Sequence, residues 1–158
     1  MTRIHPVALA STTTLTRYLG ALAVLAVGVD HIEQYYVDYY RAVPTIGTLF
    51  MLDFMSATVI AIGLLLPLGR LTSRCGDRLF TLLALAGIGI GAGTLAGLLA
   101  SVNVGLFGFM EVGYRSAIVL SIVFDVAAVA FLSAFLALRA LSHGARGHSL
   151  THHKELAQ

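Results

Sequence analysis

Apolar residues along the chain fall into four long runs that are separated by short polar segments. The runs cover residues 18–37, 46–68, 79–101 and 116–138. A helix needs about 20 mainly apolar residues to cross a hydrocarbon layer roughly 30 Å thick, and each run has that length. Because lipid offers no hydrogen-bond partners, the backbone must be satisfied within each segment, which excludes open strands. The pattern predicts an all-α protein, a bundle of four transmembrane helices spanning residues 18–138.

Basic residues are distributed unequally between the two sides that these spans define. Eight of the ten Lys and Arg residues fall on the side of the termini and of segment 69–78, and only Arg41 and Arg115 fall on the other. Lys and Arg accumulate on the cytoplasmic side of membrane proteins. The pattern therefore predicts an N-in/C-in topology, with a cytoplasmic segment 1–17 and a cytoplasmic polar tail 139–158.

An alternative for the first 28 residues is a cleaved signal peptide, with Ala26-Val27-Gly28 as its small-residue cleavage site. The long polar stretch before the apolar run favours a retained helix instead. Tyrosines cluster where the first span ends, as is typical of an aromatic belt at a membrane interface; they are Tyr35, Tyr36, Tyr39 and Tyr40.

Composition supports the membrane assignment and narrows the classes of function. Hydrophobic residues make up 58% of the chain and charged residues 11%, whereas soluble domains average about 45–50% and about 25%. The net charge of +2 comes from basic residues at the ends of apolar runs, so no nucleic-acid partner is indicated. The single Cys75 excludes an internal disulfide and a multi-cysteine metal site. The expected partner is the lipid bilayer.

Small residues recur through the third span. Gly91-Ala92-Gly93-Thr94-Leu95-Ala96 matches a dinucleotide-binding loop by letter, but it lies inside an uncharged apolar run rather than at a strand-to-helix turn. The informative spacing is that of Gly89, Gly93 and Gly97, which places three glycines on one helical face. Such a face lets another helix approach closely. Its partner is a helix of this chain, a second copy or another membrane subunit, and the sequence leaves these alternatives open.

Ionisable residues inside the spans are the candidates for function, since charges in the membrane are costly and usually face the protein interior. Asp30, Asp53 and Asp125 lie on three different helices. The rise of about 1.5 Å per residue places the first two roughly 10 Å, and the third roughly 15 Å, from the outer ends of their spans. We expect the three carboxylates to meet in one pocket near the outer side.

Two further residues join this set of candidates. Glu33 shares a helical face with Asp30, and His31 is rotated from Asp30 by about 100°. The five residues are candidates for binding a proton or small ligand, and His31, Asp53 and Asp125 also for binding a metal ion. In the alternative, structural interpretation, the acids are neutral or paired with Arg115 and only hold the helices together. No cofactor is indicated, and no paired catalytic motif suggests an enzyme.

The chain resembles the DoxX-like group of small bacterial membrane proteins in its four helices, in His31 near the outer end of the first span and in Asp53 in the second. The resemblance covers residues 18–138 and implies a bacterial plasma membrane and an association with redox, sulfur or quinone chemistry. Uncharacterised actinobacterial membrane proteins are similar too, through Ile46-Gly47-Thr48-Leu49-Phe50.

Three functions remain open at this point. The first is an outer-side site for a proton, metal ion or small ligand. The second is an accessory subunit of a larger membrane complex. The third is a small dimeric transporter that couples protons to a substrate through its membrane acids.

Overall fold

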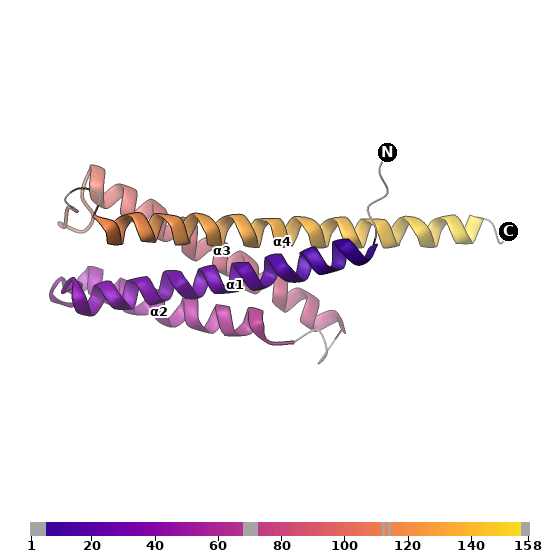
Figure 1. Cartoon of the computed structure of the whole chain (residues 1–158), viewed down its shortest axis with the longest axis horizontal. Helices are drawn as coiled ribbons and strands as arrows, with labels where there is room; N and C mark the ends of the chain where they lie inside the picture. Colours follow the sequence, from indigo (N-terminus) through magenta and orange to yellow (C-terminus); the bar gives the residue numbers. More distant parts are fainter. Residues whose placement is uncertain (1–5, 68–72, 112, 114, 156–158) are drawn as a thin grey trace.

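The computed structural model contains four long helices and one short 3₁₀ helix. It describes residues 6–67, 73–111, 113 and 115–155, with side chains described in 9–67, 76–111, 113 and 115–142. The elements are α1 (Pro6–Val37), η1 (Tyr40–Ala42), α2 (Pro44–Leu65), α3 (Ser73–Asn103) and α4 (Ser116–Glu155). The start of α1 and the end of α4 lie at the same end of the bundle (Figure 1). We call this the terminal end and the other the loop end.

All four long helices carry stretches that are long and apolar enough to cross a membrane: Leu9–Val37, Pro44–Leu65, Gly76–Asn103 and Ser116–Ser142. Large apolar side chains on their outer faces are exposed, as is expected where lipid rather than protein surrounds a helix. The prediction of an all-α, multi-pass membrane protein is confirmed. The side of the membrane on which the termini lie stays a prediction.

The helices differ in length from the predicted spans. α1 begins at Pro6 and α4 continues to Glu155, so both extend into segments that were predicted to lie outside the bundle. Hydropathy marks where a helix leaves lipid and does not mark where the helix ends. In the early part of α1 the hydroxyl groups of Thr13 and Thr14 donate to carbonyl oxygens four residues back, so polar residues continue the helix.

Two prolines set the bounds of α2. Pro44 occupies its first turn, where the missing N–H would have no helical partner anyway. Leu66 follows the helix with extended backbone angles, because the residue before Pro67 is disfavoured in the helical region. The apolar run continues to residue 68, and the helix stops short of it for this reason.

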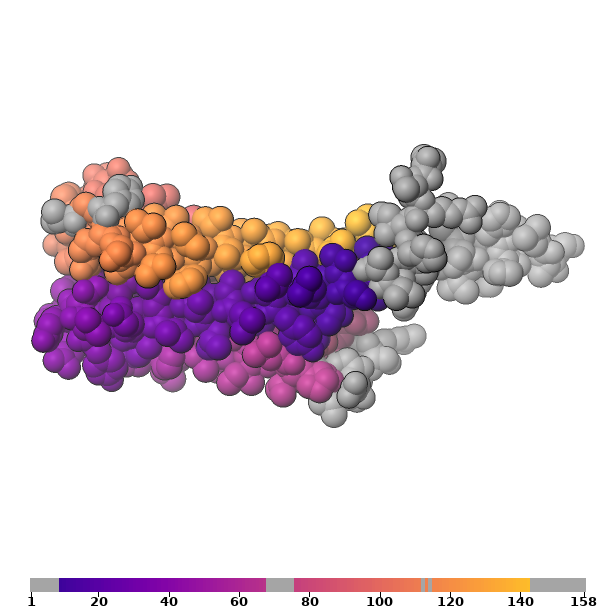
Figure 2. Space-filling model, viewed as in Figure 1, coloured from indigo at the N-terminus to yellow at the C-terminus, as the bar shows by residue number. Residues whose placement is uncertain are grey.

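The core lies where α1 packs between α2 and α4. Its fully buried members are mostly small or aliphatic: Ala21, Val24, Ala57, Leu64, Ala84, Ala128 and Leu132. A Cβ atom added at Gly28 would lie 2.9 Å from the Cβ atom of Ala57, so glycine is required for this approach of α1 to α2. Figure 2 shows α1 and the coloured part of α4 side by side, and α4 continues beyond the start of α1 (Figure 1). By contrast, α2 and α3 meet over a shorter seam and diverge toward the loop end (Figure 1).

Candidate functional site

His31 and Asp53 face each other across the α1–α2 seam. The Nδ1 atom of His31 lies 3.1 Å from Oδ2 of Asp53 and 2.9 Å from the carbonyl oxygen of Val27. The imidazole is 6% exposed and packs its edge against Phe50, with ring centroids 4.6 Å apart. Nδ1 is therefore engaged by protein acceptors, and Nε2 is the nitrogen that takes part in neither contact.

Asp125 is the most deeply buried acid among the described residues. It is 1% exposed, and its Oδ1 atom accepts a hydrogen bond of 2.6 Å from the hydroxyl group of Thr94 on α3. Its Oδ2 atom has no hydrogen-bond partner among the described residues. A buried acceptor without a partner costs about 1–3 kcal/mol. This carboxylate can therefore receive one further donor.

Close approach of α3 and α4 brings Thr94 and Asp125 together. A Cβ atom at Gly91 would lie 3.0 Å from the backbone oxygen of Asp125. One turn further along α3, the hydroxyl group of Thr94 reaches across to Asp125. Thr94 was missed by the sequence analysis, although a hydroxyl group in an uncharged span was a usable signal.

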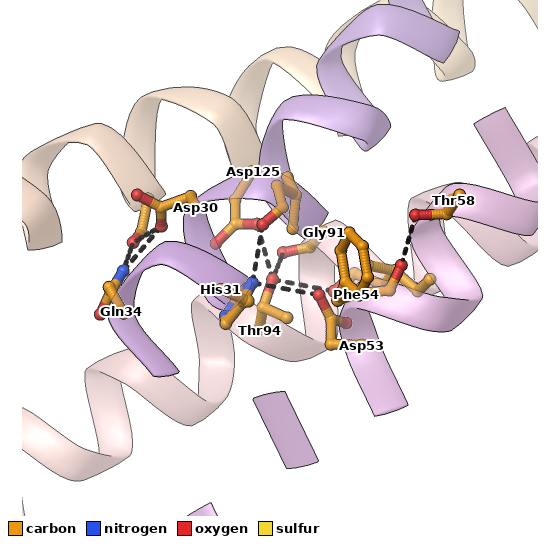
Figure 3. A network of polar contacts seen from close by, with 12 residues as sticks. Asp30, His31, Gln34, Asp53, Phe54, Thr58, Gly91, Thr94 and Asp125 are labelled. Carbon is orange, nitrogen blue, oxygen red and sulfur yellow. Dashed lines mark hydrogen bonds and ion pairs between the residues drawn. The ribbon is translucent and has the colours of Figure 1, made fainter. Parts of the chain in front are cut away.

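Asp30 belongs to a different cluster. The expectation that it meets Asp53 and Asp125 in one pocket is therefore wrong. Its Oδ2 atom accepts a 2.7 Å hydrogen bond from Nε2 of Gln34 and another from the hydroxyl group of Ser121 on α4. Gln34 also contacts Ser121, at 3.0 Å. Figure 3 shows Asp30 and Gln34 apart from the group formed by His31, Asp53, Thr94 and Asp125.

The helical rotation of about 100° per residue explains this separation. Asp30 points to α4, and the next residue, His31, points to α2. Glu33 is exposed, because it is rotated by about 60° from Asp30 in the direction away from α2. Asp30 and Glu33 are therefore not part of the site, and Asp30 holds α1 to α4 instead.

Asp53, Asp125 and His31 all line one cavity of about 390 Å³, which receives side chains from all four long helices at the loop half of the bundle. Small-molecule sites usually occupy about 300–1,000 Å³. Most of its wall is apolar, from residues that include Ile46, Leu49, Phe50, Leu52, Ile90, Leu98, Leu106, Phe109 and Ile118. The polar groups that line it are His31, Gln34, Tyr40, Asp53, Ser56, Thr94, Ser101, Glu111, Ser121 and Asp125.

The cavity opens on the lateral surface of the bundle. Four of its lining residues are exposed: Leu49 (42%), Leu52 (54%) and Ser56 on α2, and Gly93 on α3. All four lie inside their membrane-spanning stretches. The mouth therefore faces the region that lipid occupies, at the seam where α2 and α3 diverge.

A polar cluster closes the cavity at the loop end. The hydroxyl group of Tyr40 donates to Glu111 and accepts a 3.0 Å hydrogen bond from Arg115. Arg115 also contacts Glu111 at 3.4 Å and Asp38 at 3.1 Å. Burial, together with the Glu111 carboxylate, raises the pKa of the Tyr40 hydroxyl group above its usual value. Glu111 and Arg115 thus form a pair four residues apart, and the partly buried Glu111 is also bonded to Tyr40.

The segments that connect the helices direct Tyr40, Leu106 and Phe109 toward the cavity. Tyr39 has a left-handed φ of 62°, uncommon for a residue with a side chain, and it turns the chain so that Tyr40 is buried while Tyr39 is exposed. Tyr40 is thus not part of an aromatic belt. Between α3 and α4, Leu106 and Phe109 exchange backbone hydrogen bonds of 2.6 and 2.9 Å, and both line the cavity.

The glycines of α3 divide into two sets. Gly91, like Gly87, lies where an added Cβ atom would meet another helix closely. Gly89 and Gly93 have no atom within 4 Å of such a Cβ, and at Gly97 the nearest is Leu106 at 3.8 Å. The helix-packing face predicted for Gly89, Gly93 and Gly97 has no tight contact with another helix in the part of the chain that the structure describes. Its role toward another subunit or copy stays a prediction.

Among the described residues, no group of three or more His, Cys, Asp or Glu side chains is arranged to hold a metal ion. The proposed metal ligands His31, Asp53 and Asp125 share a cavity but do not converge on a common point in this way. No protein-family model, no curated protein and no solved structure matches this chain.

Proposed function

We propose that this protein binds a small lipid-soluble molecule whose polar head donates hydrogen bonds to Asp125. The observation that carries the proposal is the Oδ2 atom of Asp125, which is buried on a cavity wall and has no hydrogen-bond partner among the described residues. A ligand hydroxyl or amino group would supply the missing hydrogen bond. The Asp30 cluster needs no such ligand, because its donors and acceptors satisfy one another.

The chemistry of the wall narrows the class of ligand further. Of the three acids that line the cavity, Asp53 faces His31 and Glu111 contacts Arg115, whereas Asp125 has no basic partner among the described residues. An anion beside Asp125 would be repelled strongly where the dielectric is low. An anionic head is therefore disfavoured, and the proposed ligand is neutral or cationic: an alcohol, a phenol or an amine. The apolar wall suits a hydrocarbon or aromatic body. Entry from the bilayer, through the mouth between α2 and α3, suits a molecule that dissolves in lipid.

Native mass spectrometry of protein extracted in a mild, lipid-preserving detergent tests the proposal. We expect wild-type protein to retain a neutral or cationic small molecule. Asp125→Asn should weaken retention by about 10- to 100-fold, the equivalent of a hydrogen bond to a charged group. The hydroxyl group of Thr94 donates to one side-chain oxygen of residue 125, so in the Asn variant it takes the amide oxygen. The amide NH₂ group then faces the ligand's donor and cannot accept its hydrogen bond.

Glu33→Gln is the matched control, since it makes the same carboxylate-to-amide change at an exposed position outside the cavity. Equal retention by wild type and Asp125→Asn would contradict the proposal. Intact wild-type protein that carries companion proteins and no small molecule would favour the accessory-subunit function instead. Proton-coupled flux that Asp53→Asn abolishes would favour a transporter.

We also propose the orientation that the basic residues predict, with both termini cytoplasmic in a bacterial plasma membrane, and a relationship to DoxX-like proteins. The excess of Lys and Arg on the terminal side supports the orientation. A reporter fused to either terminus, active only in the cytoplasm, tests it. Activity of a reporter that works only outside the membrane would contradict it.

A further inference from the structure

A second cleft lies at the terminal end of the bundle, between α1, α3 and α4. Its volume is about 290 Å³, and it shares no lining residue with the cavity around Asp125. Two arginines line it, Arg17 on α1 and Arg139 on α4, above the buried rings of Phe80 and Phe135. Two guanidinium groups at one cleft are a frequent arrangement for binding anionic oxygen groups.

Arg17 is held in place by aromatic rings and has no counter-ion among the described residues. The Cζ atom of its guanidinium lies 4.7 Å from the ring centroid of Tyr18 and 4.7 Å from that of Phe80. No carboxylate among the described residues pairs with it, and its Nε atom is buried without a hydrogen-bond partner. Stacking fixes the plane of the group, while its donors stay available to an acceptor from outside the chain.

Arg139 supplies a second, partly neutralised guanidinium. Its side chain is 13% exposed, its NH2 atom lies 2.8 Å from Oδ1 of Asp77, and its Cζ atom lies 5.5 Å from the ring centroid of Phe135. The hydroxyl groups of Thr13 and Ser142, which also line the cleft, donate to backbone carbonyl oxygens. One Asp therefore balances one of the two arginines, and Arg17 provides the net positive charge.

The position of the cleft along the helices indicates its ligand. Arg17 immediately precedes the apolar run 18–37, and Arg139 immediately follows the run 116–138. Residues at the ends of apolar runs lie at the level of lipid head groups, and basic pockets between helices at this level bind anionic head groups. We propose that this cleft binds the phosphate group of an anionic phospholipid, with Arg17 as its anchor.

Lipid titration of the full-length protein in detergent, read by native mass spectrometry, tests this site. Wild-type protein should bind phosphatidylglycerol more tightly than phosphatidylcholine. Arg17→Gln should lower the affinity for phosphatidylglycerol by about fivefold or more, the equivalent of one basic residue at the membrane surface. Arg78→Gln is the matched control, because Arg78 is exposed and lies outside the cleft, and it should bind as wild type does.

Three outcomes would overturn the proposal. They are an equal affinity of wild type for both lipids, an equal loss in Arg17→Gln and Arg78→Gln, and a response to inorganic phosphate without a response to phosphatidylglycerol. If Arg17→Gln does not fold, Arg17→Lys replaces it. Arg17→Lys keeps the charge but loses the planar fork, and it should keep the preference for phosphatidylglycerol with a lower affinity.

Discussion

The α1–α4 seam and the α2–α3 seam of this bundle differ in how their polar groups are satisfied. Along the first, Asp30, Gln34 and Ser121 form a closed set of hydrogen bonds. Beside the second, Asp125 keeps an acceptor without a partner on the wall of a cavity. Both seams contain a buried acid, so the presence of an acid does not by itself mark a binding site. The two seams are distinguished by the Oδ2 atom of Asp125, which has no hydrogen-bond partner among the described residues and lies beside a cavity.

The glycines mark where helices approach each other closely and where they do not. Gly28 permits α1 to approach α2, and Gly91 permits α3 to approach α4. Gly93 meets nothing within 4 Å of an added Cβ and lies at the cavity mouth. Gly28 and Gly91 thus lie at close contacts between helices, whereas Gly93 lies at the opening of the cavity.

The largest expected effect comes from filling the tight α1–α2 contact. Gly28→Leu would place its Cβ atom 2.9 Å from the Cβ atom of Ala57 and 3.4 Å from the backbone of Phe54, so the helices must separate. We expect a loss of about 3 kcal/mol or more in the free energy of unfolding, measured by denaturation in mixed detergent micelles. Gly89→Leu, at a position with open space, is the control. A Gly28→Leu variant as stable as wild type would show that the seam is not closed as described.

A smaller loss is expected when the closed polar cluster is broken. Asp30→Ala removes the acceptor of Gln34 and Ser121, and buried donors left without a partner should lower the free energy of unfolding by about 1–3 kcal/mol. Ligand retention should fall less than in Asp125→Asn, because Asp30 itself does not line the cavity, although its partners Gln34 and Ser121 do. Thermal denaturation and native mass spectrometry of one sample give both readouts. A lost ligand with unchanged stability would reverse the roles assigned to Asp30 and Asp125.

The smallest effect is expected at the closed end of the cavity. Tyr40→Phe removes the hydroxyl group that joins Glu111 to Arg115, which should lower the free energy of unfolding by about 1 kcal/mol. Tyr36→Phe, at an exposed tyrosine, should change it by less than about 0.5 kcal/mol. Equal effects of the two substitutions would show that the cluster around Tyr40 contributes nothing.

The four spans could be predicted from sequence because hydropathy over about 20 residues is set by the bilayer. The pairing of His31 with Asp53 was not predicted, but it could have been, because the two residues have similar predicted depths on consecutive antiparallel spans. The direction in which Asp30 points could not be predicted, since one residue of rotation separates a contact with α4 from a contact with α2. The partners Gln34 and Thr94 were missed because uncharged polar residues give a weak signal in an apolar run.

The cavity itself has no local signature in the sequence. It arises where α2 and α3 diverge, and that angle depends mainly on the packing of α2 against α1 and of α3 against α4. The stripe of Gly89, Gly93 and Gly97 suggested close packing, whereas Gly93 marks an opening. Small residues permit approach but do not require it.

Ligand retention by two matched leucine variants is the sharpest test of a ligand site that opens between α2 and α3. Gly93→Leu would fill the mouth between α2 and α3, and Gly89→Leu adds the same side chain one turn away, outside the cavity lining. Neither added Cβ atom meets a neighbour within 4 Å, so both variants should fold. We expect native mass spectrometry to find the small molecule on wild type and Gly89→Leu and not on Gly93→Leu. Full retention by Gly93→Leu, or equal loss from both variants, would contradict a ligand site that opens between α2 and α3.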